Sequence, residues 1–192
     1  MKKIIIAIDS FKGCLTSAEA GKAAEKGIKS INPSCHTSVI PIAHGGEGLL
    51  DVLITATKGK YITLSAHGPL MKMAKTHYGL SGNGRTAIIE MAAISGLPLV
   101  PIEQRNPMLT TTFGTGELIK DALNKGCRNF IIGIGGSATN DAGLGMLQAL
   151  GFRFLDKSGH TLGTGGQIME AVANIDTSGI HPALRETHFM VA

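Results

Sequence analysis

Three times along this chain, a short apolar run is followed by a loop that contains glycine and then by a helical pattern. The loops begin at Asp9, His44 and Gly133. Short runs rich in β-branched residues are typical of strands buried in a parallel sheet. The alternation of strand, loop and helix therefore predicts an α/β fold with right-handed connections.

Local signals locate the expected elements. Thr16-Ser-Ala-Glu19 has the pattern of a capping box and predicts a helix that extends to about Lys29. Ser81-Gly-Asn-Gly84 is a strong hairpin turn. Further strands are expected at 4–8, 37–43, 61–66, 71–80, 85–91, 128–132 and 152–155, and further helices at 49–57, 115–125 and from the third loop to about 150.

The pattern changes from parallel to antiparallel between residues 58 and 68. We therefore expect a boundary there, with residues 1–64 in the first domain and residues 65–192 in a second α/β domain that contains antiparallel strands. A chain of 192 residues that is 43% hydrophobic is long enough for this arrangement and for a substantial core.

Composition and charge exclude several classes of protein. The net charge of +4 is mild, and no Lys/Arg cluster is interleaved with aromatic residues, so we expect no nucleic-acid partner. The 3 cysteines are widely spaced and form no C-x-x-C pair, which disfavours a disulfide framework or zinc site and favours a reducing compartment. The apolar N-terminal run stops at Asp9, too early for a signal peptide or a membrane span. A cytoplasmic protein without a membrane partner is expected.

The third loop, from Gly133 to Asp141, combines glycine with the expected start of a helix. Glycine lets backbone N–H groups approach a ligand closely, and a helix N-terminus favours an anion. The sequence predicts that this loop holds a phosphate-like group. Asn140 and Asp141 either cap the helix or hold a metal ion or a hydroxyl group, and both alternatives stay open.

The other loops also carry candidate chemistry. Asp9 could act as a base or a Mg²⁺ ligand and Lys12 could neutralise phosphoryl charge, or both could belong to an exposed turn with a loose ion pair. Glu47 could bind a ligand or simply supply a favourable charge in the first turn of a helix. The hydroxyl-rich segment 110–116 could bind an anion or cap the next helix.

A competing interpretation concerns nicotinamide cofactors. Gly133-x-Gly135-x-x-Ala138, with Asp156 after the next expected strand, is a passable dinucleotide fingerprint and would indicate a dehydrogenase. Gly143 and Gly145 fall inside its helix, and the other two loops stay unexplained.

Together these loops resemble the bacterial type 1 glycerate kinase family, ATP-dependent enzymes that phosphorylate glycerate. The matching segments run in order over nearly the whole chain, which makes the set far more specific than any one of them. They are Asp9-Ser-Phe-Lys-Gly13, Ala43-His-Gly-Gly-Glu-Gly48, Gly68-Pro-Leu70, Ala87-Ile-Ile-Glu-Met-Ala92, 111–118 and 135–143.

The resemblance implies a flavodoxin-like parallel-sheet domain, incomplete here, a second α/β domain inserted into it, and an active site in the cleft between them. It implies ATP and Mg²⁺ as cofactors and D-glycerate as the substrate. The metal ligand is not determined; Asp9 and Asp141 are candidates. The expected catalytic residues are Asp9, Lys12 and Asp141. The expected substrate- or nucleotide-binding residues are Ser10, Gly45, Gly46, Glu47, Glu90, Thr112, Gly114, Gly135, Gly136, Ser137 and Asn140.

The chain departs from the family pattern in three respects. Ile8 replaces a usual proline, which is expected to change only loop stiffness. His44 replaces a usual aspartate, which would impair activity if that carboxylate binds metal or substrate. Family members are longer, and the apolar run 188–192 resembles a strand cut in its middle. The expectation is a fragment with an exposed apolar face that favours self-association, and a catalytically inactive fragment is the alternative to an active kinase.

Overall fold

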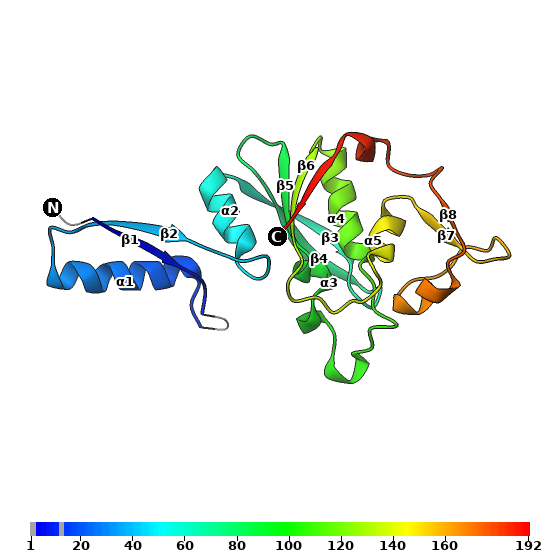
Figure 1. Ribbon diagram of the computed structural model, residues 1–192, viewed down its shortest axis with the longest axis horizontal. Coiled ribbons are helices and arrows are strands. Elements are labelled where there is room, and N and C mark those ends of the chain that lie inside the picture. Colours follow the sequence, from blue (N-terminus) through cyan, green and yellow to red (C-terminus); the bar gives the residue numbers. More distant parts are fainter. Residues whose placement is uncertain (1–2, 12–13) are drawn as a thin grey trace.

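A computed structural model describes residues 3–11 and 14–192, and its first part is a β-α-β unit. Strands β1 (Lys3–Ile8) and β2 (His36–Pro41) pair in parallel, and α1 (Ser17–Ile31) connects them. The predicted capping box is confirmed, because the Glu19 N–H donates to the Thr16 side chain and the Glu19 carboxylate accepts from the Thr16 N–H. This unit projects from the rest of the molecule (Figure 1).

The larger body is built on a five-stranded mixed sheet. Its order is β3 (Lys60–His67), β4 (Met73–Leu80), β5 (Thr86–Glu90), β6 (Asn129–Gly133) and β9 (His188–Val191). β3 pairs with β4 and β4 with β5 in antiparallel fashion, whereas β5 pairs with β6 and β6 with β9 in parallel. The predicted hairpin turn is confirmed, since the Gly84 N–H donates to the Ser81 carbonyl and the Ser81 N–H to the Thr86 carbonyl.

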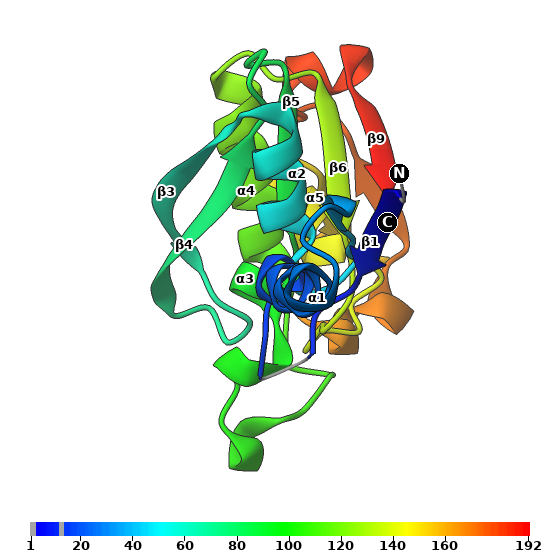
Figure 2. The same cartoon turned by 90° about the vertical axis from the view of Figure 1, so that its left-hand side faces the viewer.

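Two helices cover opposite faces of this sheet (Figure 2). α4 (Phe113–Asn124) buries its apolar side in the main core with Tyr78, Ile89 and Phe130. α2 (Leu49–Thr57) packs on the other face against Ile88. Successive residues of β5 are therefore buried on alternate faces, which explains the continuous apolar run in its sequence.

Short elements complete the body. They are α3 (Ala92–Ser95), η1 (Leu97–Leu99), η2 (Ile102–Gln104), α5 (Leu144–Ala149), β7 (Arg153–Leu155), η3 (Gly166–Ala171), β8 (Asn174–Asp176) and η4 (Pro182–Glu186). β7 and β8 form a separate antiparallel pair. None of the helices in the described part of the chain is both long and apolar enough to cross a membrane.

The α/β class and the change from parallel to antiparallel pairing agree with the sequence-based expectation. The flavodoxin-like domain with an inserted second domain, and the division at residue 64, stay predictions. Within the described residues, β3 is an edge strand of the five-stranded sheet and α2 packs on that sheet, so β1, α1 and β2 form the smaller unit.

Candidate active site

The three loops expected to carry chemistry lie next to one another. We call them the first loop, after β1; the second loop, His44–Gly48; and the glycine loop, 134–143. The glycine loop is the expected third loop as the structure bounds it, between the end of β6 and the start of α5. The first and second loops meet where His44 Nδ1 lies 2.7 Å from a carboxylate oxygen of Asp9. The second loop meets the glycine loop where the Gly135 N–H donates to the Gly45 carbonyl at 2.7 Å.

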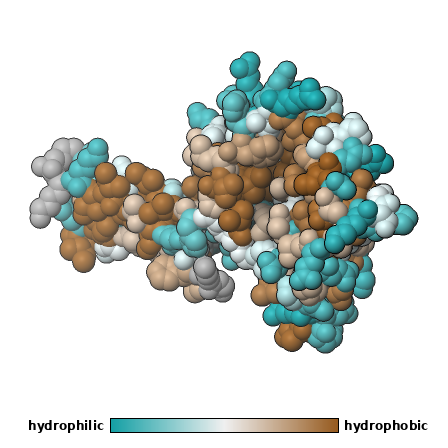
Figure 3. Space-filling model, turned by 45° about the vertical axis from the view of Figure 1, so that its right-hand side comes forward, coloured by the Kyte–Doolittle hydropathy of each residue, from teal (hydrophilic) through white to brown (hydrophobic). Residues whose placement is uncertain are grey.

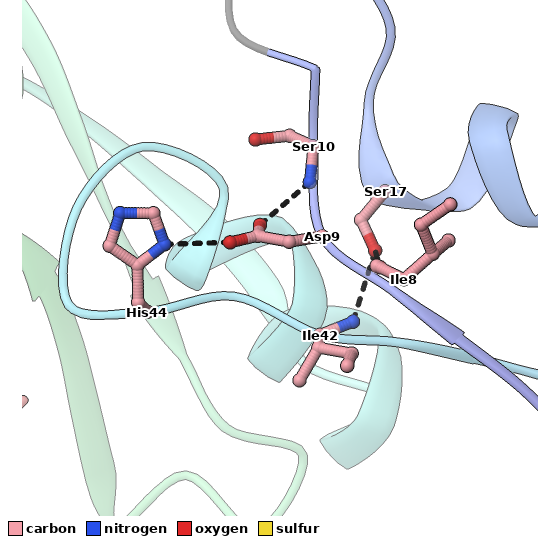
Figure 4. A network of polar contacts seen from close by, with 6 residues as sticks. All are labelled: Ile8, Asp9, Ser10, Ser17, Ile42 and His44. Atoms are coloured by element: carbon pink, nitrogen blue, oxygen red, sulfur yellow. Dashed lines mark hydrogen bonds and ion pairs between the residues drawn. The ribbon is translucent and has the colours of Figure 1, made fainter.

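Asp9 is held as an anion at the end of β1 (Figure 4). Its carboxylate accepts the Ser10 backbone N–H at 2.6 Å, and this bond, followed by the contact with His44, lowers its pKa. Ser17 fixes the adjoining strand ends, because its hydroxyl donates to the Ile8 carbonyl and accepts from the Ile42 N–H. Sequence reasoning missed this role of Ser17; its only signal is a second hydroxyl residue directly after the Thr16 N-cap.

A pocket of about 330 Å³ lies between the first loop, the start of α1 and α2. Three predicted site residues line it: Asp9, Ser10 and Glu47. Asp51 adds a further carboxylate, and much of the remaining wall is apolar, with Phe11 as its aromatic member. The structure thus brings together the polar residues of the first and second loops. Lys12 lies outside the described residues.

Backbone packing explains the first glycines of the glycine-rich stretch. A Cβ atom at Gly135 would lie 2.8 Å from the Gly46 Cα, and one at Gly133 would lie 2.8 Å from the Gly45 carbonyl oxygen. Real Cβ atoms do not approach so closely, so these glycines let the second loop pack against the strand end. Gly136 differs, because it is exposed and its backbone conformation is the reason for glycine. Its φ of +77° lies in the left-handed region, which glycine adopts more readily than other residues.

Asp141 is 1% exposed, and its capping role is confirmed. It accepts hydrogen bonds from the backbone N–H groups of Gly143 and Gly145 at the start of α5. The same carboxylate accepts from the Thr112 N–H at 2.8 Å and from the hydroxyl groups of Thr111 and Thr112. Donors therefore surround both oxygens, which disfavours Asp141 as a metal ligand.

Glu90, at the end of β5, caps the N-terminus of α2. Its carboxylate accepts the Leu50 N–H at 2.8 Å and so caps a helix whose N-cap residue, Gly48, has no side chain to do so. Burial is the main cause that raises the Glu90 pKa, and the Leu50 bond opposes it.

The remaining predicted residues lie away from the pocket. Gly114 is buried where a Cβ would lie 1.9 Å from the His67 carbonyl oxygen, so its role in the structure is close packing. The Thr112 hydroxyl is engaged with Asp141, and the Ser137 hydroxyl pairs with Thr139. Asn140 is exposed on the glycine loop.

The structure does not support the dinucleotide fingerprint. That motif needs a helix that starts within the glycine turn. Here a non-helical segment separates Gly135 from α5, which begins at Leu144. Asp156 follows β7, a strand outside the five-stranded sheet, and its carboxylate accepts the Ser158 and His160 N–H groups of its own turn.

Comparison with known proteins decides the family. The profile of the glycerate kinase family matches residues 4–192. The chain belongs to this family. It is 52% identical over 190 residues to the glycerate kinase of Bacillus subtilis (strain 168) and 48% identical over 190 residues to the glycerate 2-kinase of Escherichia coli (strain K12), covering 99% of this chain and 50% of each relative.

A solved structure agrees with these sequence matches. The crystal structure of a candidate glycerate kinase 2 from Salmonella typhimurium LT2 is similar to the whole chain, with a TM-score of 0.90 and 47% identity. The match covers 52% of that protein. The chain therefore spans about half the length of the family members that it matches.

Proposed function

We propose that this chain supplies the first part of a site that transfers phosphate from ATP to D-glycerate, giving phosphoglycerate. The observation that carries the proposal is sequence identity. About half of the aligned residues, over 99% of this chain, are identical to those of relatives named glycerate kinase or glycerate 2-kinase. The contacts among the three loops support it, because residues of the first and second loops line one pocket and the glycine loop is hydrogen-bonded to the second loop.

Within this site, Asp9 is the candidate for contact with the reacting hydroxyl group of glycerate. Its lowered pKa keeps the carboxylate anionic at neutral pH, as a hydrogen-bond acceptor or metal ligand requires. Ser10 and Glu47 line the same pocket and are candidates for substrate contacts. Lys12 follows in the same motif, where an ammonium group would stabilise phosphoryl charge.

The glycine loop is the candidate phosphate site. Gly136 is exposed with a positive φ, and Asn140 offers an exposed amide close to it in sequence. Neighbouring N–H groups in such a turn form a concave anion-binding surface. Gly45, Gly46 and Gly135 contribute by bringing the second loop against this one.

Mg²⁺ is the proposed metal cofactor, and the donor set fits weak protein coordination. Among residues 3–11 and 14–192, no group of three or more His, Cys, Asp or Glu residues could hold a metal ion. Mg²⁺ is commonly held by one or two carboxylates together with substrate phosphates, and Asp9, Glu47 and Asp51 share the pocket wall. When bound, the ion would neutralise phosphoryl charge. We assign the metal contact to Asp9 rather than to Asp141.

The proposal includes a cytoplasmic location. A cytoplasmic enzyme acting on a small anionic substrate, without nucleic-acid or membrane partners, agrees with the modest net charge of +4.

The decisive experiment measures ADP release from ATP by the purified chain with Mg²⁺, with and without D-glycerate. Release stimulated by glycerate is expected, and Asp9→Asn should abolish it. Asp156→Asn is the matched control, because Asp156 also accepts backbone N–H groups but lies in a distant turn. A folded chain without stimulated release would contradict activity and support the inactive alternative.

The same assay tests the histidine that replaces the usual aspartate. In His44→Asp the Asp9 carboxylate would face a second carboxylate instead of an imidazole, a pair that attracts a divalent cation. We expect glycerate-stimulated release to rise in this variant. A fall would show that the Asp9–His44 contact is itself needed.

A further inference from the structure

We propose that Asp141 is a positioning residue whose buried carboxylate joins the starts of α4 and α5 and thereby fixes the shape of the glycine loop. The consequence for catalysis rests on the proposed function of that loop in binding phosphate. Asp141 then contributes without touching a ligand, in contrast to the direct catalytic role expected from its motif.

The first step is the contact of one carboxylate with two separate segments. On the α4 side, the donors are the Thr112 N–H at 2.8 Å and the Thr111 hydroxyl at 3.2 Å. On the α5 side, they are the Gly143 N–H at 3.1 Å and the Gly145 N–H at 3.2 Å. Because hydrogen bonds to a buried anion are strong, this arrangement holds the two segments at one separation.

The second step connects this junction to the glycine loop. The Thr110 hydroxyl, next to the held residues, donates to the Ala138 carbonyl at 2.8 Å. On the other side, the Ala138 N–H donates to the Ser95 carbonyl at 2.9 Å, and the Leu97 N–H donates to the Gly136 carbonyl at 2.9 Å. The loop is thus clamped between segment 95–97 and segment 110–112. Asp141 holds the second clamp directly, so loosening it lets the loop move away from segment 95–97 and opens the hydrogen bonds of the Leu97 and Ala138 amides in the first clamp.

Gly145 provides an independent observation of the same junction. A Cβ atom there would lie 1.9 Å from the Thr111 hydroxyl oxygen and 2.9 Å from the Asp141 carboxylate. Any side chain would push these groups apart, which explains a glycine inside α5. Gly145→Ala therefore disturbs the junction without changing its charge.

The test is amide hydrogen exchange on the full chain. Asp141→Asn places an NH₂ group where backbone N–H groups point, which weakens the junction. Exchange of the Leu97 and Ala138 amides should therefore become at least about fivefold faster. Gly145→Ala should accelerate the same two amides to a similar extent. Amides of β3 and β4 should not change. Gly163→Ala is the matched control, because no atom lies within 4 Å of the Cβ position there.

Thr110→Val isolates the second step. It removes the hydroxyl that reaches Ala138 and leaves the carboxylate contacts intact, so it should accelerate the Ala138 amide but not the Gly143 and Gly145 amides. If Asp141→Asn and Gly145→Ala accelerate only the amides bonded to the carboxylate, Asp141 is a local cap and the proposal is wrong.

ATP titration by calorimetry gives the functional readout. We expect both junction variants to bind ATP at least about fivefold more weakly than the unaltered chain, with Gly163→Ala unchanged. Equal ATP affinity in all variants would show that the Asp141 junction does not affect ATP binding and would overturn that part of the proposal. If the unaltered chain binds no ATP, the proposed function fails, and hydrogen exchange still decides the role of Asp141.

Discussion

Three carboxylates of similar chemistry have different roles at the residue scale because their surroundings differ. Asp9 is partly exposed, and hydrogen bonds from the Ser10 N–H and from His44 lower its pKa. Asp141 is fully engaged by donors inside the protein. Glu90 is partly buried, caps a helix and has a raised pKa. Residue type alone does not distinguish these roles.

Glu90 should make stability depend on pH in a defined direction. Its pKa is raised above the ordinary value of 4.5, so the folded state keeps the proton to higher pH than the unfolded state does. This contribution to stability is present below 4.5 and is lost as pH rises through the raised pKa. Glu90→Gln has no such loss and should gain stability relative to the unaltered chain over that window, as urea unfolding at several pH values would measure.

The capping bond of Glu90 provides the control. Glutamine keeps an oxygen that accepts the Leu50 N–H, whereas Glu90→Ala removes the acceptor and should cost about 0.5–2 kcal/mol near neutral pH. If the free energy of unfolding varies with pH in the same way for Glu90→Gln and the unaltered chain, the pH dependence does not come from the raised pKa of Glu90.

At the element scale, α1 contains two glycines in different surroundings. No atom lies within 4 Å of a Cβ built at Gly27, whereas a Cβ at Gly21 would lie 2.4 Å from a methyl carbon of Val39. Gly27→Ala should stabilise the protein by about 0.5–1 kcal/mol, because alanine has the higher helix propensity. Gly21→Ala should destabilise it by about 1–3 kcal/mol through overpacking.

Urea unfolding of both variants tests this pair. A gain in stability for Gly21→Ala would mean that Val39 moves aside and that α1 is held loosely on β2.

The sequence located elements well where their signals are local. The capping box of α1 and the hairpin turn at Ser81–Gly84 involve residues three to five positions apart. It located α5 less well, because the expected helix followed the glycine loop directly. In the structure a turn stabilised by Asp141 comes first, and α5 begins at Leu144.

At the scale of the whole molecule, one face of the β1–β2 pair is bare. α1 covers the face that contains Ile6, while Ile5 and Ile40 on the other face are 60% and 51% exposed. On the side of this projecting unit that Figure 3 shows, hydrophobic residues cover much of the surface. Parallel sheets are normally covered on both faces, so a bare face favours association.

Self-association of the chain through this face therefore stays a prediction. Sedimentation velocity should show concentration-dependent association, weakened at least about tenfold by Ile40→Lys. Ile102→Lys is the control, because Ile102 is 78% exposed on a distant segment. A monomer at all concentrations, or an equal effect of both substitutions, would contradict this prediction.

By itself, the sequence determined the α/β class, most strands and helices, and the family resemblance, because apolar periodicity, caps and turns depend on residues close together in the chain. Only the tertiary structure decided what the motif residues contact. Leu50 and Glu90 are 40 positions apart, and Thr112 and Asp141 are 29 apart. Contacts over such separations depend on how the elements pack. Glycines of the third loop let one loop pack against another, which the sequence did not predict, and their contact with a phosphate stays a prediction.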